Sequence, residues 1–281
     1  MSGALQIGPF SLPWQLLAVF VAIAVSSSVG HRLGRRAGVD IDPQMLRMLL
    51  VAVVVARLAF VVLFFDAYRS SPLGILDIRD GGWRPLPGLL AAWVYGLWLG
   101  LRSRPMRLAL WGALGSATLV WAAAGLALLL MATANTPLPS ISLKALDGRQ
   151  VSLHQFEGKP TVVNLWATWC PPCRREMPVL AQAQATHADV NFVFLNQGEA
   201  AEKVGDFLSG EKLALRNVLL DRQGEASGQL GQRALPTTLF FDASGRLVDT
   251  RIGEVSLATL TERLLAIRVA PSSTNPSHLN P

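Results

Sequence analysis

The sequence predicts a chain of two unlike parts: an N-terminal, all-α polytopic membrane domain of about four transmembrane helices, then a C-terminal α/β domain. Three observations predict this fold class. Hydrophobic residues make up 51% of the 281 residues and charged residues only 16%, against roughly a quarter charged in an average soluble domain. The formal charge of +6 lies entirely in residues 1–135, which contain eleven Arg, no Lys and five Asp. Strand and helix patterns alternate only after residue 136.

Four apolar segments approach the roughly 20 residues that a helix needs to cross a bilayer. The first and last contain no charged residue, and the third is short and rich in Gly, so it is open to a re-entrant or tilted interpretation. The second contains Arg57, and an Arg inside a membrane helix costs about 2.5–3.5 kcal/mol on insertion scales. Arg57 therefore requires a partner, a lipid phosphate or an aqueous cavity. The alternative interpretation is that it snorkels to the interface or pairs structurally with a loop acid such as Asp66. The four segments are residues 10–30, 45–65, 86–101 and 108–132.

The basic residues of this region predict its orientation, because short cytoplasmic loops collect Lys and Arg. The loops after the first and third segments are basic, so both are expected on the cytoplasmic side. This places the N-terminus and everything after residue 133 outside. The charge is not clustered with interleaved aromatic residues, so it indicates topology and not nucleic-acid binding. The basic loop residues are Arg32, Arg35, Arg36, Arg102, Arg104 and Arg107.

A Pro-rich linker near residue 136 opens the second domain, which we expect to extend to residue 269 and to be followed by a disordered tail, 270–281. Apolar patterns predict two short strands within 141–153, joined by an Asp147-Gly148 turn. They also predict strands 161–166, 190–196 and 217–220, a hairpin of 237–242 with 246–253, and helices 171–184, 200–209 and 256–267. The last helix should present Leu257, Leu260, Leu264 and Leu265 on one face. A central sheet covered on both faces follows.

The two Cys of the chain, Cys170 and Cys173, lie in WCPPC, after a predicted strand and at the start of a helix. A structural disulfide would close too short a loop to add much stability, and a zinc site needs about four ligands, which the spacing of the His residues does not supply. A c-type haem would require a His at the position of Arg174. A pair of inert core cysteines is disfavoured by the two prolines between them. A thiol at a helix N-terminus is stabilised as thiolate. We expect redox chemistry, with Cys170 as nucleophile and the more buried Cys173 as resolving residue.

The run VVNLWATWCPPCRREMP, the later LPTTLFFD and the order of strands and helices resemble the TlpA-like family of membrane-tethered thioredoxins, over residues 138–268. The resemblance implies a thioredoxin-like fold and thiol-disulfide oxidoreductase activity, more often as a reductant. It implies no cofactor besides the Cys170–Cys173 disulfide, and protein thiols or disulfides as substrates. Residues 1–135 contain no Cys, so a separate membrane electron donor or oxidant is expected. The leading hypothesis is a periplasmic enzyme of a bacterial inner membrane.

The resemblance also implies roles for single residues. Pro236 corresponds to the cis-proline of the family, and Trp169, Pro171, Pro172, Leu235 and Thr237 are the residues expected to contact substrate. Asn164 stands where cytoplasmic thioredoxins carry a buried Asp. Glu176, in the pattern CxxCxxExP, is the substitute proton acceptor for Cys173, and an ordinary first-turn acid is the alternative interpretation. No metal ligand set is expected.

A second resemblance covers residues 45–101. VVARLAFVVLFF, then SPLGILDIRDGG, then a Gly-containing apolar helix are similar to the early part of prolipoprotein diacylglyceryl transferases. This chain has GGWRPLPG where that family carries an aromatic-His-Gly-Gly element, and it lacks the later helices. The resemblance implies an alternative function as a lipid-binding or lipid-transferring module with an accessory redox domain. Arg57 would then be the candidate lipid-binding residue.

Overall fold

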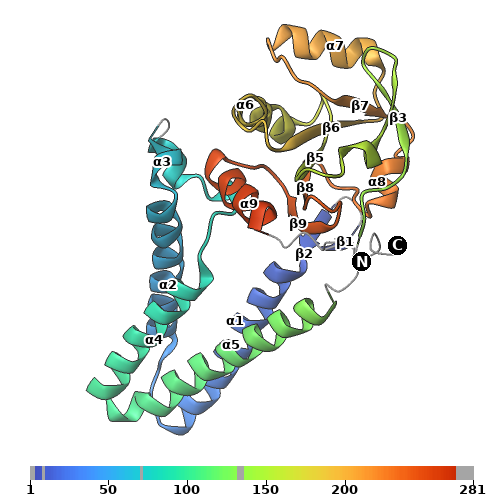
Figure 1. Cartoon of the computed structure of the whole chain (residues 1–281). Coiled ribbons are helices and arrows are strands. Elements are labelled where there is room, and N and C mark those ends of the chain that lie inside the picture. The colour runs from blue at the N-terminus through green and yellow to red at the C-terminus, as the bar shows by residue number, and fades with distance from the viewer. Residues whose placement is uncertain (1–3, 8–9, 70–71, 132–135, 270–281) are drawn as a thin grey trace, which may run out of the picture.

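The computed structural model describes residues 4–7, 10–69, 72–131 and 136–269, and it divides them into a helical half and a sheet-containing half (Figure 1). Long helices of the helical half are α1 (Trp14–Arg36), α2 (Asp42–Leu63), α4 (Pro85–Arg102) and α5 (Arg104–Met131). A hairpin of β1 (Ala4–Ile7) and β2 (Phe10–Pro13) precedes them. The helix α3 (Phe65–Tyr68) and the 3-10 helices η1 (Pro72–Leu76) and η2 (Ile78–Asp80) connect α2 to α4.

The helix boundaries differ from the predicted segments at two places. Helix α1 begins at Trp14 and not at residue 10, because the residue before Pro13 is restricted to extended backbone and Phe10–Pro13 pairs as a strand. It then continues through the predicted basic loop to Arg36, where Arg35 and Arg36 face the negative end of the helix dipole. Helix α5 begins at Arg104, so only Ser103 separates it from α4. The basic clusters therefore lie at helix ends more than in loops.

Three helices of the described residues are long and apolar enough to cross a membrane: α1, α2 and α5. The third predicted segment, α4, is one continuous helix of 18 residues, and not a re-entrant loop. It packs against α2 and α5. Its glycines permit this close packing: Gly88 lies against the backbone of α2 at Ala52, and Gly96 lies against Leu114 of α5.

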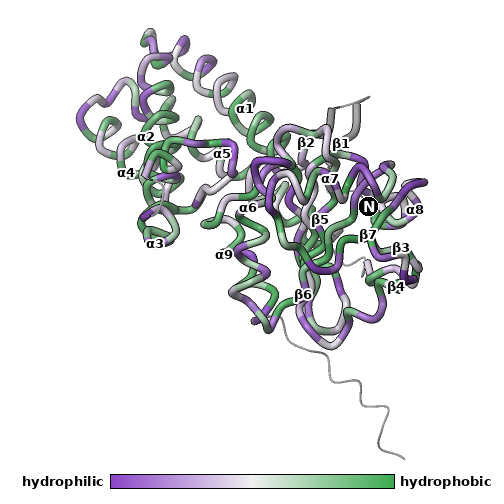
Figure 2. Tube along the Cα trace, turned by 90° about the horizontal axis from the view of Figure 1, so that it is seen from above, coloured by the Kyte–Doolittle hydropathy of each residue, from purple (hydrophilic) through white to green (hydrophobic). Residues whose placement is uncertain are grey.

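The four long helices expose large apolar side chains outward. Figure 2 shows many hydrophobic turns among the helices of this half. A soluble monomer rarely exposes so much contiguous apolar surface, whereas lipid would cover it. The linkers between α1 and α2 and between α4 and α5 lie together at the end of the helices away from the sheet (Figure 1). Exposed apolar residues include Val62, Leu90, Val94, Leu108, Leu119 and Leu129.

The sheet-containing half holds a seven-stranded sheet in the order β4-β3-β7-β6-β5-β8-β9. Strands β5, β6 and β7 are parallel, and the outer strands pair antiparallel. The strands are β3 (Ser142–Ala145), β4 (Gln150–Ser152), β5 (Thr161–Trp166), β6 (Asn191–Gln197), β7 (Val218–Asp221), β8 (Thr237–Phe241) and β9 (Leu247–Ile252). The helices are η3 (Leu153–Phe156), α6 (Pro171–Thr186), α7 (Ala201–Gly210), α8 (Glu225–Gln229) and α9 (Leu257–Val269). Every strand and helix predicted for this half is present, whereas η3 and α8 were not predicted.

Both faces of the sheet are covered, as predicted. All six residues of β5 are buried, and its alternate side chains enter two apolar clusters. Val162 and Trp166 pack with residues of α6 and α9, and Val163 and Leu165 pack on the opposite face. The predicted face of α9 was wrong at Leu265, which is 51% exposed. At 100° per residue, Leu265 lies about 140° around the helix from the buried Leu260.

Candidate active site

The cysteine pair lies where the central strand β5 ends and α6 begins. Cys170 caps α6, and its Sγ accepts a hydrogen bond from the backbone N–H of Cys173 at 3.3 Å. Pro171 and Pro172 occupy the first turn, where a missing N–H costs nothing because those groups have no partner within a helix. The two sulfurs form a disulfide, with 5.3 Å between the Cα atoms. Cys173 is fully buried and Cys170 is 3% exposed, which matches the predicted order.

An exposed aromatic residue precedes Cys170, and a loop that contains Pro236 packs against the cysteine cluster. Trp169 is 63% exposed. The peptide bond between Leu235 and Pro236 is cis, as predicted, and Leu235 packs against the cluster that contains both cysteines. The carbonyl of Pro236 accepts a hydrogen bond from the N–H of Gly253 at 2.8 Å. Thr237 is buried and donates its hydroxyl to the carbonyl of Ala234, so its side chain holds the loop together.

Glu176 is buried, about one helical turn after Cys173, and it lies beyond the first turn of α6, so it is not the first-turn acid of the alternative interpretation. Its Oε1 accepts a hydrogen bond from Asn164 Nδ2 at 2.8 Å, and its Oε2 accepts one from the N–H of Val255 at 3.0 Å. Burial raises its pKa from 4.5 to about 8, against the opposing hydrogen bonds from Asn164 and Val255. Residues three apart on a helix share a face. Glu176 and Cys173 therefore both point into the core beside Asn164.

Sequence reasoning missed a second buried carboxylate, Glu199, which follows β6. It accepts hydrogen bonds from the N–H and the hydroxyl of Thr168, at 2.7 and 2.6 Å, and from Asn196 Nδ2 at 2.8 Å. Lys203 binds it at 2.8 Å. Burial opposes ionisation of Glu199, but the hydrogen bonds from Lys203, Thr168 and Asn196 outweigh it and lower its pKa to about 2. The anion thus fixes the backbone two residues before Cys170. The sequence signal that could have identified Glu199 is the position of an acidic residue just after the apolar strand β6.

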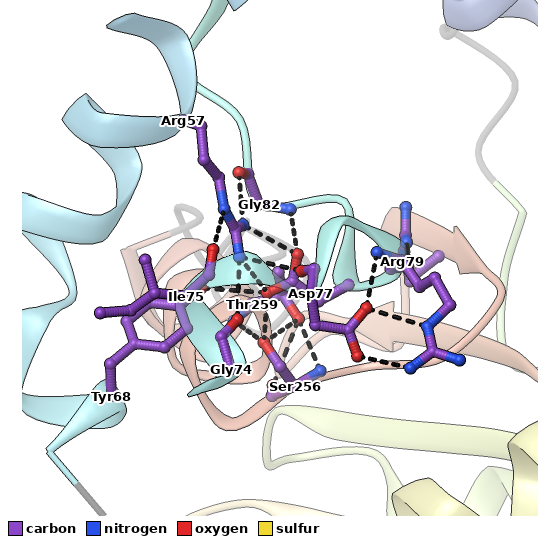
Figure 3. A network of polar contacts seen from close by, with 11 residues as sticks. Arg57, Tyr68, Gly74, Ile75, Asp77, Arg79, Gly82, Ser256 and Thr259 are labelled. Atoms are coloured by element: carbon purple, nitrogen blue, oxygen red, sulfur yellow. Dashed lines mark hydrogen bonds and ion pairs between the residues drawn. The ribbon is translucent and has the colours of Figure 1, made fainter. Parts of the chain in front are cut away.

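Arg57 lies outside this site, in α2, and its partner is Asp80 and not Asp66. Arg57 Nη1 donates to Asp80 Oδ1 at 2.9 Å, and both side chains are buried. The remaining guanidinium hydrogens are donated to carbonyls of the loop after α3 (Figure 3). Asp66 pairs instead with Arg69 in an exposed ion pair. The carbonyl acceptors are those of Gly74, Ile75, Asp77 and Gly82.

The two consecutive glycines, Gly81 and Gly82, have a structural role around the Arg57–Asp80 pair. Gly81 has φ +67°, a backbone conformation that favours glycine. A Cβ at Gly82 would overlap the ring of Phe60 and the guanidinium of Arg57. Both glycines are therefore needed for the loop to close around Arg57 and Asp80.

Comparison with known proteins decides the family. The Redoxin family model matches residues 133–264. The thioredoxin-like protein YneN of Bacillus subtilis (strain 168) is 33% identical over 132 residues, which are 45% of this chain and 75% of the relative. The thiol-disulfide oxidoreductase ResA of Geobacillus thermodenitrificans (strain NG80-2) is 30% identical over 133 residues, which are 46% of this chain and 75% of the relative. The chain belongs to the thioredoxin-like thiol-disulfide oxidoreductases.

The other half of this oxidoreductase has a different similarity. The family model of prolipoprotein diacylglyceryl transferase matches residues 2–129, in agreement with the resemblance predicted from residues 45–101.

A solved structure of dsbF from MTB, in mixed oxidized and reduced forms, is 31% identical and aligns with 46% of this chain and 96% of that chain, at a TM-score of 0.44.

The raised pKa of Glu176 predicts that the oxidoreductase loses stability as the pH rises. Its carboxyl has a pKa near 4.5 when unfolded and about 8 when folded, so the folded state binds more protons between these values. The contribution is complete below about 4.5 and is lost as the pH rises through about 8. Thermal unfolding of the full chain in detergent, at several pH values between about 5 and 8, measures it. Glu176→Gln, which cannot ionise, should lose less stability over this range. An equal fall in both proteins would contradict the prediction.

Proposed function

We propose that this oxidoreductase is tethered to the inner membrane of a bacterium, faces the periplasm and reduces disulfides of other proteins with Cys170 and Cys173. The observation that carries the proposal is the position of the pair. Both sulfurs lie at the N-terminus of α6, where the N–H of Cys173 points at Cys170 Sγ and the helix dipole stabilises a thiolate. Trp169, the residue immediately before Cys170, is exposed.

The reduction takes place in two exchanges. The Cys170 thiolate attacks one sulfur of the substrate disulfide, which forms a mixed disulfide and releases the other substrate sulfur as a thiolate. Cys173 then attacks Cys170 Sγ, closes the Cys170–Cys173 disulfide and releases the second substrate thiol. Two electrons pass from the enzyme to the substrate. The reaction leaves the enzyme with a Cys170–Cys173 disulfide, the pairing that the structure contains.

Substrate binding is assigned to the surface around Cys170. Trp169 and the first-turn prolines, Pro171 and Pro172, offer apolar contacts at the helix N-terminus. A shallow hollow lined by Pro171, Arg174, Arg175 and Glu211 adjoins them. The backbone around Leu235, Pro236 and Thr237 pairs with an extended stretch of the substrate.

Glu176 exchanges a proton with Cys173. A pKa of about 8 is close to that of an ordinary thiol, about 8.5, and matched values favour proton transfer. The carboxyl accepts a hydrogen bond from Asn164, which stands where cytoplasmic thioredoxins carry a buried Asp. Strand β5 has Asn164 in place of that Asp, and Glu176 of α6 therefore supplies the carboxylate.

The reduction potential of the Cys170–Cys173 pair tests the direction of electron flow. A reductant of this kind is expected near −270 mV, the thioredoxin end of the scale, and a value near −120 mV would identify an oxidant. Equilibration of the full chain in detergent with defined mixtures of reduced and oxidised dithiothreitol or glutathione, followed by alkylation of free thiols, measures it. Residues 1–135 contain no cysteine, so electrons must come from a separate donor, another protein such as a membrane electron donor or a small thiol.

The proposed topology has residues 1–135 as the membrane domain, 136–269 as the thioredoxin-like domain and 270–281 as a tail that lies outside the described residues. The N-terminus and the thioredoxin-like domain are periplasmic. The exposed apolar surfaces of α1, α2, α4 and α5 and the basic residues at one end of the helices support this arrangement. A reporter that is active only in the periplasm, fused after Ala134, should be active. The same reporter fused after Gly38 should be inactive, and the reverse pattern would overturn the topology.

A lipid-binding or lipid-transferring role of the helical half is the second candidate, and the match of residues 2–129 to the transferase family favours it. The geometry of Arg57 does not support a phosphate at this residue. Its guanidinium donates to Asp80 and to carbonyls of its own loop, and it lies near the rings of Phe60, Tyr68 and Trp83. We therefore assign Arg57 a structural role.

A further inference from the structure

Among the described residues, the loop between α3 and α4 contacts the corner between β9 and α9, where the helical half meets the sheet-containing half. Ser256 Oγ donates to Asp80 Oδ2 at 3.1 Å (Figure 3). Arg251 Nη2 donates to the carbonyl of Arg79 at 2.8 Å. An ion pair of 3.0 Å joins Arg84 to Glu262. Beneath these contacts, Ala258 of α9 is buried in a cluster with apolar and aromatic residues of α2 and α3.

The same corner holds Glu176. The N–H of Val255 donates to Glu176 Oε2 at 3.0 Å, and Val255 immediately precedes Ser256. A continuous path therefore runs from the Arg57–Asp80 pair through Ser256 and the backbone of Val255 to the carboxyl. The second carboxyl oxygen is bound by Asn164 of β5.

Two charged residues of the corner act on Glu176. Their effects on its pKa are smaller than those of burial and the hydrogen bonds: the negative charge of Glu254 raises the pKa, and the positive charge of Arg251, on β9, lowers it. Glu254 is itself paired with Arg175 of α6 at 2.7 Å. Arg251 also interacts electrostatically with Asp80, so this one cation acts on a carboxyl of the helical half and on the carboxyl of the redox site.

Gly81 determines where Arg251 lies. A Cβ at this position would overlap the guanidinium of Arg251, so the side chain rests directly on the loop backbone only because residue 81 is glycine. Asp80 is held from the other side by Arg57 and by the hydroxyl of Tyr68. The loop between α3 and α4 therefore forms an ordered surface that holds the guanidinium of Arg251, a residue of the sheet-containing half.

We propose that the loop of residues 72–84 positions the redox site of the thioredoxin-like domain: by docking on residues 251–256 it fixes the corner that binds Glu176. Arg251 and Gly81 are positioning residues that act on proton exchange at Cys173 through Glu176. The inference rests on the proposed role of Glu176. It gives the helical half a part in the redox chemistry besides anchoring, although that half contains no cysteine.

The test uses the reduced full chain in detergent micelles and a symmetrical aromatic disulfide, dithiobis(nitrobenzoate), followed by stopped-flow absorbance. Attack by Cys170 releases one coloured thiolate, and attack by Cys173 on the mixed disulfide releases the second. The pH profile of the second release reports proton exchange at Cys173. Gly81→Ala should displace Arg251, raise the pH at which the second release accelerates, and slow that release at neutral pH about threefold, the factor for half a pH unit.

Gly38→Ala is the matched control, because Gly38 has the same φ of +67° with nothing within 4 Å of a Cβ. It should leave the profile unchanged. Arg251→Gln should reproduce Gly81→Ala, and Arg251→Lys, which keeps the charge, should restore most of the wild-type profile. In a Glu176→Gln background, Gly81→Ala should have no further effect on the profile.

The outcomes distinguish a failure of the proposed role of Glu176 from a failure of the docking inference. If Glu176→Gln leaves the profile of the second release unchanged, the proposed role of Glu176 is wrong, and the inference is wrong with it. If Glu176→Gln removes the pH-dependent step while Gly81→Ala and Arg251→Gln leave it in place, only the docking inference is overturned. Equal shifts in Gly81→Ala and Gly38→Ala would assign the effect to backbone strain and would also overturn it.

Discussion

Replacing Cys173 with Ala is expected to trap the oxidoreductase on its substrates through Cys170, whereas replacing Cys170 with Ala leaves no trapped species. Cys170 lies at the helix N-terminus beside the exposed Trp169, and Cys173 is fully buried behind it, so only Cys170 can reach a substrate sulfur. Turnover should fall about a thousandfold or more in either variant, as it does when a nucleophile is removed. Non-reducing electrophoresis of membranes treated with acid to quench exchange, together with the rate of reduction of a protein disulfide, measures both effects.

The control for this prediction is the double variant, Cys170→Ala with Cys173→Ala, which should form no adduct. Adducts in the Cys170→Ala variant would contradict the assigned order of attack, because Cys173 would then have to meet substrate directly. Adducts in both single variants would indicate that α6 opens far enough to expose the inner cysteine.

The redox site could be predicted from the sequence to a large extent because its parts are local. Cys170, Cys173 and Glu176 lie within one strand-to-helix segment, and burial of all six residues of β5 makes that strand a continuous apolar run. Pro236 is distant in sequence but lies at the start of an equally apolar strand, β8. The apolar strands and the residues at the helix N-terminus can be recognised from short stretches of sequence, because each depends on neighbouring residues.

The parts that escaped prediction depend on contacts between distant residues. Glu199 lies 31 residues from Thr168, and only the parallel pairing of β5 with β6 brings the carboxylate to the loop before Cys170. Asp80 was not identified as the partner of Arg57 because the chain turns after α2 and returns through two 3-10 helices. Asp66, closer in sequence, is left at the surface. Charge alone does not distinguish such acids, since the path of the loop decides which one is buried.

Arg57→Met is expected to lower the free energy of unfolding by about 3–5 kcal/mol, the cost of leaving a buried ion without its partner. Asp80 would then keep hydrogen bonds from Tyr68, Gly82 and Ser256, but no cation. Unfolding of the full chain by heat or by denaturant in detergent measures the change. Arg69→Met is the matched control, because the exposed pair of Arg69 with Asp66 should contribute little.

The double variant, Arg57→Met with Asp80→Asn, distinguishes a structural role from a lipid-binding role. Because it removes both charges together, it should recover part of the stability that Arg57→Met loses, and thiol-disulfide exchange should recover with it. If Arg57 instead bound a lipid phosphate, neutralising Asp80 would restore nothing. Loss of a cellular phenotype in Arg57→Met at unchanged stability, with that phenotype intact in the cysteine variants, would then support the lipid module. Recovery in the double variant would mean that the membrane-helix arginine serves the loop on which the redox domain docks.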